Sequence, residues 1–291
     1  MGGRRSFAWV LNLDAELEMA EPSYCPRART LEQLKRYGQG ARTLLGPEDV
    51  ILDGTNLAAL GRVGRAWCPT PRALARMQAA GVEPEPHPPF YVLCTVNHRK
   101  FAVDLALGLK GQCYIEDRAL LDSLLGRGNR HWMLKRPLAF SGRGQQRILS
   151  EVVGTQSSWI DASLRRSGLV AEPLVTPSLE VSLHGFVWQD KRHELGKVCV
   201  QDVSERGVFR GIRVMHEGEL TPDEERQFRG SAEQTAAALG GAGYFGPFGI
   251  DGYRYTMEDQ VGFCALGEIN ARYTMGFVTG FPRHPSELSL E

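Results

Sequence analysis

The sequence lacks a run of about 18 apolar residues, which is the minimum length of a membrane-spanning helix. It also lacks net charge, because 34 Lys and Arg residues balance 34 Asp and Glu residues. A chain without an excess of one sign has no general attraction to nucleic acid or to an anionic membrane. We therefore expect a soluble protein that binds neither, and in which local groups hold any charged ligand.

Signatures of metal-thiol sites and of hydrolases are missing as well. The six cysteines form no CxxC pair and the seven histidines are scattered, so the sequence predicts neither a zinc site nor a disulfide framework. No GxSxG or GxxxxGK[ST] motif is present. The apolar run of residues 7–11 is interrupted too soon by Asp14 for a signal peptide and predicts a first strand. Reduced cysteines in a cytoplasmic protein fit these features best.

The pattern of apolar residues predicts an α/β protein with three parts. At 291 residues the chain is long enough for one large domain or for two to three packed subdomains. Short apolar runs alternate with helical stretches near the N-terminus, whereas antiparallel strands follow from Leu169 onward. Four prolines within 84–89 predict a surface loop that leads into a strand at 90–96. The predicted parts are an N-terminal α/β domain (1–96), a central subdomain (97–172) and a C-terminal subdomain (173–291).

The C-terminal part contains a clear helix start. Thr221 precedes Pro222 and three acidic residues, which is typical of an N-cap followed by the first helical turn. We expect this helix to end near Leu239, before two glycines. Two strands, at 244–255 and 261–271, then follow and are joined by a short turn.

A first chemical signature combines a lysine with a glycine-rich turn. A strand predicted at 131–137 carries Lys135, and a Ser-Gly-x-Gly sequence follows it. The ammonium and the backbone N–H groups of a flexible turn suit a polyphosphate. The same turn also fits a plain hairpin, which leads into a strand or helix start at 147–153. The phosphate-binding candidates are Lys135, Ser141, Gly142, Gly144 and Gln145.

A second signature joins two predicted strands. Glu172 ends one strand, and Glu180 lies near the start of the next. Backbone groups of Leu174 and Val175 between them would read an adenine edge, and Glu180 would accept both ribose hydroxyls. The alternative is that the two glutamates face solvent.

A third signature lies on the two C-terminal strands. Glu268 and Asn270 are two residues apart and share one face of a strand, which a hairpin places beside Asp251. Adjacent carboxylates repel each other unless a cation intervenes, and oxygen ligands of this kind suit Mg²⁺. Arg272, on the same face, would bind phosphate or a developing oxyanion. The alternative is a plain ion pair between Glu268 and Arg272.

With these three signatures in this order, residues 96–277 resemble the ATP-grasp superfamily. The resemblance implies an α/β (α+β) fold in which two sheet-containing subdomains grip ATP after an N-terminal α/β domain. It places the phosphates at the first signature, the nucleoside at the second with Glu172 in the adenine hinge, and magnesium at the third. A further phosphate-binding cation is expected at Arg99 or Lys100, of which we choose Lys100.

The resemblance further implies an ATP- and Mg²⁺-dependent carboxylate-amine ligase that releases ADP. A substrate carboxylate would attack the γ-phosphate, and an amine would displace phosphate from the acyl phosphate. Lys135 and Arg272 are the catalytic candidates, because they would neutralise the phosphates and the acyl phosphate. The expected partners are small-molecule or peptide carboxylates and amines, with room for Mn²⁺ in place of Mg²⁺ and for a homodimer. A kinase on the same scaffold and a nucleotide-binding protein without turnover are the alternatives.

Overall fold

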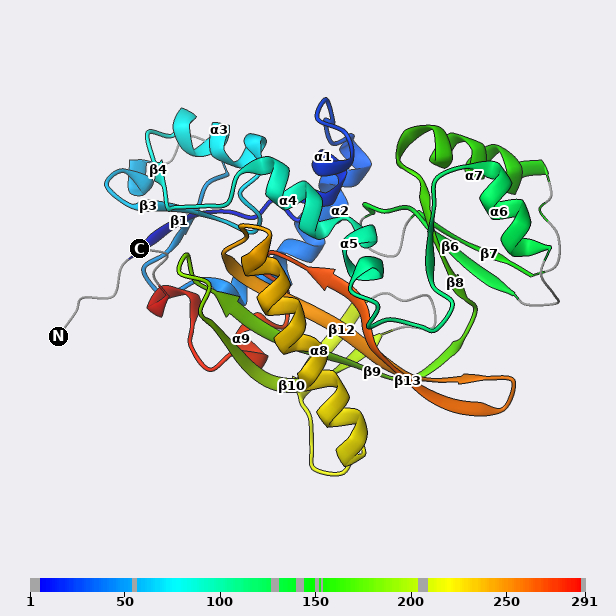
Figure 1. Cartoon of the computed structure of the whole chain (residues 1–291). Helices are drawn as coiled ribbons and strands as arrows, with labels where there is room; N and C mark the ends of the chain where they lie inside the picture. Colours follow the sequence, from blue (N-terminus) through cyan, green and yellow to red (C-terminus); the bar gives the residue numbers. More distant parts are fainter. Residues whose placement is uncertain are drawn as a thin grey trace.

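Three β-sheets organise the chain (Figure 1). The computed structural model describes residues 6–53, 57–126, 131–139, 144–149, 152, 154–203 and 209–288. In Figure 1 the N-terminal sheet and the sheet of central residues lie on opposite sides, with a five-stranded sheet between and below them. The structure mixes α-helices with parallel and antiparallel sheets, as predicted. The division of the chain at residues 96/97 and 172/173 stays a prediction.

The N-terminal sheet is parallel and has the strand order β2-β1-β3-β4. All four residues of β1 are buried, as is typical of an inner strand in a parallel sheet whose two faces are both covered. The predicted first strand is therefore confirmed. The elements of this region are β1 (Phe7–Val10), α1 (Ala15–Ala20), α2 (Ala28–Ala41), η1 (Arg42–Leu44), β2 (Val50–Ile51), η2 (Leu57–Ala59), β3 (Val63–Ala66), α3 (Pro71–Ala79) and β4 (Glu83–Pro84).

The expected strand at 90–96 is wrong, because Phe90–Asn97 form helix α4. A short run of apolar residues fits a buried helix as well as a buried strand, so the apolar pattern did not decide between them. Val92, Leu93 and Val96 are buried in the largest hydrophobic cluster. Burial of one helical face therefore determines this segment, and helix α5 (Arg99–Asp104) follows after a single residue.

The central sheet is antiparallel, with the strand order β5-β8-β6-β7. Strands β6 and β7 pair with each other, so the glycine-rich turn between them belongs to a hairpin. From the sequence we expected a strand or a helix start at 147–153. The second strand of this hairpin instead lies at 145–148. The elements are β5 (Cys113–Ile115), α6 (Arg118–Leu125), β6 (Trp132–Lys135), β7 (Gln145–Ile148), α7 (Gly154–Ser167) and β8 (Leu169–Pro173).

The C-terminal sheet has five antiparallel strands in the order β11-β10-β9-β12-β13. Its two last strands form the predicted hairpin, whose turn is made by Glu258 and Asp259 at positive φ angles of 49° and 62°. Two consecutive residues of positive φ match the right-handed twist of the flanking strands. The strands are β9 (Thr176–Val187), β10 (His193–Val203), β11 (Phe209–Val214), β12 (Gly246–Met257) and β13 (Gln260–Asn270).

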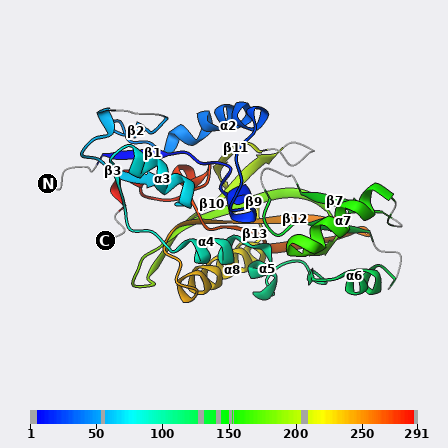
Figure 2. The ribbon, with the colours of Figure 1, turned by 90° about the horizontal axis from the view of Figure 1, so that it is seen from above.

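Helix α8 (Pro222–Gly241) covers one face of the C-terminal sheet (Figures 1 and 2). Phe228 on this helix is fully buried, and a Cβ atom on Gly252 of β12 would lie 2.8 Å from its ring. Only glycine at position 252 lets the helix approach this closely. The helix includes the two glycines after Leu239 that were expected to end it. Two short elements close the described chain, α9 (Phe277–Gly280) and η3 (Pro285–Glu287).

No helix in the part of the chain that the structure describes combines the length and the hydropathy needed to cross a membrane. The longest helix, α8, has 20 residues but carries charged side chains along its exposed face. Its N-terminus is fixed by reciprocal hydrogen bonds: the Thr221 hydroxyl accepts from the Glu224 backbone N–H at 3.2 Å, and the Glu224 carboxylate accepts from the Thr221 N–H at 2.8 Å. Thr221 is thus the N-cap that the sequence predicted.

Replacing this cap tests how much the helix start contributes to stability. We expect Thr221→Ala to lower the free energy of unfolding by about 1 kcal/mol, because one backbone N–H loses its acceptor. Thr221→Ser keeps the hydroxyl and should stay within about 0.5 kcal/mol of the parent. Urea unfolding of the three proteins gives the comparison. Equal losses in the Ala and Ser variants would show that the threonine methyl group, and not the cap, matters.

Candidate functional site

The hairpin of β12 and β13 places two carboxylates next to each other. Asp251 pairs with Glu268 across the hairpin, and Ile250 pairs with Ile269 on the opposite face. Side chains of directly paired residues have Cβ atoms about 5 Å apart. The Asn270 amide donates a hydrogen bond to Asp251 at 3.0 Å, measured from Nδ2 to Oδ2. The three predicted magnesium ligands therefore lie together on one face of the sheet.

The Asp251 carboxyl is held in an environment that opposes its ionisation. Burial, together with the negative charge of Glu268, raises its pKa to about 7. The Gln201 amide on β10 donates to Asp251 at 2.5 Å, which counteracts part of this shift. Near neutral pH this carboxyl is consequently poised between its protonated and ionised forms.

Lys135 on β6 faces this group from the central sheet. Its ammonium forms an ion pair with the buried carboxylate of Glu172, which also accepts a hydrogen bond from Gln112 at 3.2 Å. Burial raises the pKa of Glu180 on β9, whereas the charge of Lys135 opposes that rise. The negative charge of Glu180 in turn contributes to the raised pKa of Asp251. The electrostatic chain from Lys135 through Glu180 to Asp251 connects the two sheets.

Glu172 and Glu180 do not behave as solvent-facing side chains. Glu172 is 5% exposed and Glu180 is half-buried, so the solvent-facing alternative is wrong for Glu172. Leu174 and Val175 form the two-residue connection between β8 of the central sheet and β9 of the C-terminal sheet. The Leu174 N–H donates to the His131 carbonyl at 2.9 Å, so the chain already uses this backbone donor.

The described part of the glycine-rich turn lies beside Lys135. Gly144 has a φ of 72°, and its carbonyl accepts a hydrogen bond from the Arg136 N–H at 2.7 Å. Gln145 pairs directly with Lys135 across the hairpin. Ser141 and Gly142, the other candidates of this turn, lie outside the described residues.

The two candidate cations at the start of α5 point to different places. Arg99 donates from Nη2 to the Glu268 carboxylate at 2.6 Å and from Nη1 to the Arg136 carbonyl at 2.7 Å. Lys100 instead binds both oxygens of Asp104, at 2.7 and 2.8 Å, on an exposed part of the same helix. The contacts favour Arg99 over Lys100, which was our choice from the sequence.

Arg272 lies just beyond the end of β13, and it does not form the ion pair with Glu268 that was the alternative to a ligand-binding role. Its guanidinium binds Glu16 of α1, and no ion pair with Glu268 is found among the described residues. Burial lowers the pKa of Arg272, but the neighbouring acidic groups, Glu16 first and then Glu268 among them, together raise it by more, so the net shift is upward. Arg272 also donates from Nη2 to Asn270 Oδ1 at 2.9 Å. It therefore stays beside the carboxylate group, fixed from the N-terminal region.

Three residues that position this site were not identified from the sequence. Gln201 binds Asp251, Glu16 binds Arg272, and Asn97 joins the end of α4 to the residue after Asn270. The side-chain carbonyl of Asn97 accepts from the Ala271 N–H at 2.9 Å. Each contact spans between 50 and 256 residues of the chain, so no local pattern indicates it. The only sequence features that could have indicated them are Asn97, an asparagine at a helix end, and Gln201, a polar residue within an apolar strand.

The donor set fits a divalent cation with oxygen ligands. No group of three or more His, Cys, Asp or Glu side chains suited to a metal occurs within the described residues. Mg²⁺, however, binds proteins through one or two carboxylates and completes its octahedron with water and phosphate oxygens. Asp251 and Glu268 supply two carboxylates. The raised pKa of Asp251 shows that ionisation of this carboxyl is disfavoured, and a bound cation would favour it. Asn270 is the weaker ligand, because its oxygen accepts from Arg272.

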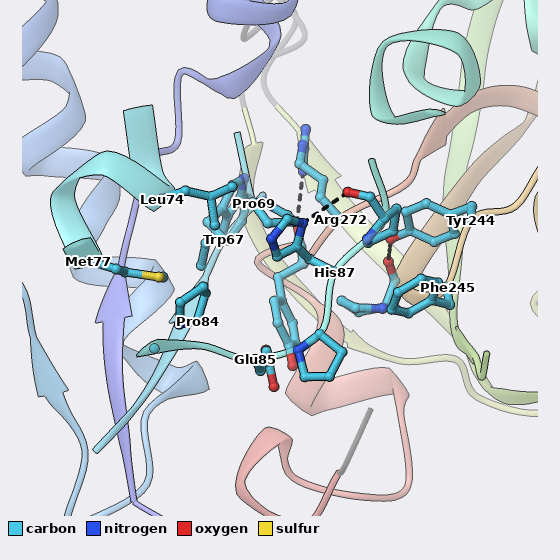
Figure 3. Close-up of a pocket in the computed structure, with 17 residues that line it drawn as sticks. Trp67, Pro69, Leu74, Met77, Pro84, Glu85, His87, Tyr244, Phe245 and Arg272 are labelled. Atoms are coloured by element: carbon cyan, nitrogen blue, oxygen red, sulfur yellow. Dashed lines mark hydrogen bonds between the residues drawn. The ribbon is translucent and has the colours of Figure 1, made fainter. Parts of the chain in front are cut away.

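A pocket lies between the N-terminal sheet and the start of β12 (Figure 3). Figure 3 shows Leu74, Met77 and Trp67 on one side of it and Tyr244 and Phe245 on the other. The N-terminal residues that line it follow or end strands β3 and β4. The edge at the carboxyl ends of parallel strands is where open α/β sheets bind ligands. Arg272 belongs to this pocket as well as to the carboxylate group.

The arrangement of three sheets has counterparts among solved structures. D-alanyl-alanine synthetase A from Vibrio cholerae is 14% identical, with a TM-score of 0.58, and the match covers 98% of this chain and 93% of that one. D-cycloserine synthetase DcsG is 12% identical, with a TM-score of 0.57 and coverage of 97% and 96%. N5-carboxyaminoimidazole synthetase from Staphylococcus aureus, complexed with ADP, is 11% identical, with a TM-score of 0.55 and coverage of 94% and 71%.

No protein-family model matches the sequence, and no curated protein matches it. At identities this low, the likeness shows a shared fold and nothing finer. The chain has the ATP-grasp fold, which confirms the fold expected from the three sequence signatures.

The pKa of Asp251 makes stability depend on pH. Its pKa is about 7 in the folded protein, against 3.8 for an unperturbed aspartate, so the folded state holds the proton more tightly than the unfolded state. The free energy of unfolding must then fall as the pH rises from about 4 to about 7. Asp251→Asn cannot titrate and should remove this fall. Urea unfolding of both proteins between about pH 4.5 and 7.5 measures the effect, and parallel pH profiles would refute the assignment. Glu268→Gln should lower the pKa of Asp251.

Proposed function

We propose that the chain binds ATP with Mg²⁺ between its central and C-terminal sheets and uses it to activate a carboxylate. The observation that carries this proposal is the charged group shared by the two sheets. Lys135 and Glu172 reach it from the central sheet, and Glu180, Asp251 and Glu268 reach it from the C-terminal sheet. A partly buried group with more carboxylates than cations suits a ligand that brings its own metal charge.

The parts of the nucleotide would be held as the sequence suggested, with one change. Adenine would lie against the backbone of the connection between β8 and β9, and Glu180 would accept the ribose hydroxyls. The hairpin of β6 and β7 would cover the phosphates, with Arg99 preferred to Lys100 as a second cation. The proposed phosphate contacts are Lys135, Ser141, Gly142, Gly144 and Gln145, and the proposed metal ligands are Asp251, Glu268 and Asn270.

The reaction would be the formation of an amide or peptide bond. An oxygen of the substrate carboxylate attacks the γ-phosphorus of ATP and ADP leaves; an amine then attacks the acyl carbon, and inorganic phosphate leaves with the carboxylate oxygen. Bound Mg²⁺ would supply positive charge at the phosphates. Lys135 would hold the phosphate charge from the other side, and Arg272 would bind the carboxylate that reacts. Positioning and electrostatics account for the whole of this chemistry.

The solved structures of similar fold support this choice among reactions. Each of the three is named as a synthetase, and one of them was complexed with ADP. Function does not follow from fold alone. Here the names of these structures agree with the reaction that we propose from the charged group around Asp251.

Removing a metal ligand should abolish turnover without unfolding the protein. We expect Glu268→Gln and Asn270→Ala to lower Mg²⁺-dependent ADP release by about 100-fold or more, because Mg²⁺ loses a ligand and no longer balances the charge of the phosphates. Glu225→Gln serves as the matched control, since Glu225 pairs with Arg229 on the exposed face of α8. ADP release is measured with pooled amino acids, dipeptides and amines. Full activity in either site variant would remove that residue from the proposed site.

The same assay separates the proposed ligase from its alternatives. ADP release that requires both a carboxylate and an amine supports the ligase. ADP release with an alcohol and no amine would instead show a kinase. ATP binding without ADP release for any acceptor would show a nucleotide-binding protein without turnover.

Nucleotide affinity tests the cations. Lys135→Met should weaken ATP binding by about tenfold to 100-fold, the value of a hydrogen bond to a charged group. Because Lys135 also neutralises buried Glu172, the double variant Lys135→Met with Glu172→Gln is needed as well, and it should stay weak although no unpaired charge remains. Arg99→Ala should weaken binding more than Lys100→Ala. Equilibrium dialysis with labelled ATP gives these affinities, and a larger effect at Lys100 would reverse our preference.

A further inference from the structure

The pocket between the N-terminal sheet and β12 is apolar to an unusual degree for a site beside a charged group. Five prolines and four aromatic side chains line it, together with Leu74 and Met77. Trp67 forms part of its wall and is 4% exposed. Proline and aromatic side chains lose little conformational entropy when a ligand binds, so such a wall is rigid before the ligand arrives.

The charged side chains in this wall are already neutralised. The ionisable groups in the described wall are the carboxylate of Glu85, the guanidinium of Arg272 and the imidazole of His87. Buried Arg65 donates to both oxygens of Glu85, at 2.7 and 2.6 Å, and Glu16 binds Arg272. A phosphate or a second carboxylate away from Arg272 would meet mainly proline, aromatic and aliphatic side chains, and burying it there without a partner would be costly.

One polar atom of the wall has no partner among the described residues. The Trp67 indole Nε1 is buried and makes no hydrogen bond. An unsatisfied buried N–H group costs about 1–3 kcal/mol. This atom is enclosed by the packing around it, so it offers no contact to a ligand in the pocket. The pocket therefore suits an apolar body.

Arg272 connects this pocket to the charged group. The guanidinium lies over the Trp67 ring, with its carbon 5.2 Å from the ring centre, and donates to Asn270, which donates to Asp251. A carboxylic acid with its carboxylate at Arg272 would have its reacting oxygens on the side of Asp251. Its side chain would then extend between Trp67 and Leu74.

We propose that this pocket selects the acid substrate by an uncharged, branched or aromatic side chain. The proposal rests on the proposed function, and it excludes a phosphorylated or dicarboxylic substrate. Trp67 and Leu74 are then the specificity-determining residues of the activation step.

The first test compares acids of matched size in the ADP-release assay with an amine pool. The apolar set is 4-methylpentanoate, phenylacetate and leucine, and the charged set is succinate, phosphoglycolate and aspartate. We expect kcat/KM to be at least about tenfold higher for the apolar set, since burial of two or three methylene groups supplies a factor of this order. A preference for any member of the charged set would overturn the proposal.

Two variants locate the selectivity. Leu74→Ala should reduce kcat/KM about tenfold for 4-methylpentanoate and phenylacetate and less for acetate, because the lost contact is with the side chain. Leu60→Ala in the same region is the control, since Leu60 is 58% exposed and is not part of the pocket. Trp67→Phe removes part of the apolar wall and should weaken every apolar acid through KM, whereas Trp188→Phe should not. Equal responses of apolar and small acids to Leu74→Ala would contradict the assignment.

A binding measurement separates failure of this inference from failure of the proposed function. The same acids are titrated calorimetrically into the protein with Mg²⁺ and a non-hydrolysable ATP analogue. Apolar acids that bind without causing ADP release would support the pocket and refute the ligase. ADP release that favours charged acids would support the ligase and refute the pocket. Absence of binding by the apolar acids would refute the pocket outright.

Discussion

Two carboxylates on neighbouring strands dominate the electrostatics of this protein. Asp251 is buried beside Glu268, and its pKa of about 7 shows that the fold holds it where its charge is disfavoured. A sheet does not require an acidic pair at this position, since an apolar pair would pack at no electrostatic cost. We propose that a divalent cation completes the interaction of this pair. The surrounding contacts with Gln201, Asn270 and Arg99 hold the carboxylates in place.

The N-terminal region takes part in the same arrangement. Asn97 accepts a hydrogen bond from the backbone just after Asn270, and Glu16 binds Arg272 across 256 positions of the chain. Through these buried contacts, segments that are distant in sequence fix the position of the chain at the C-terminal end of β13. They also bring the apolar pocket against the charged group, so that one arginine, Arg272, serves both. Selection of a substrate by its side chain and activation of its carboxylate would thus take place at adjoining walls.

Local chemistry was readable from the sequence, whereas long-range pairing was not. The start of α8 at Thr221 and the face shared by Glu268 and Asn270 follow from capping preference and from the two-residue period of a strand. The segment 90–96 was misassigned, since a short apolar run carries no period and only its burial made it a helix. The alternative of an ion pair between Glu268 and Arg272 is not found, because the carboxylate that binds Arg272 is Glu16 on α1, which no local pattern indicated. The choice between Arg99 and Lys100 depended on a helix orientation that tertiary packing sets.

The most direct test of the account is the proton balance of nucleotide binding. A cation placed between Asp251 and Glu268 must ionise Asp251, whose pKa of about 7 leaves it half protonated at neutral pH. Calorimetric titration with preformed MgATP, in two buffers of different ionisation enthalpy, gives the number of protons released. The account predicts binding with release of roughly half a proton per site at about pH 7, falling towards zero at about pH 8.5. No binding of MgATP, or binding heat that is the same in both buffers, would contradict it.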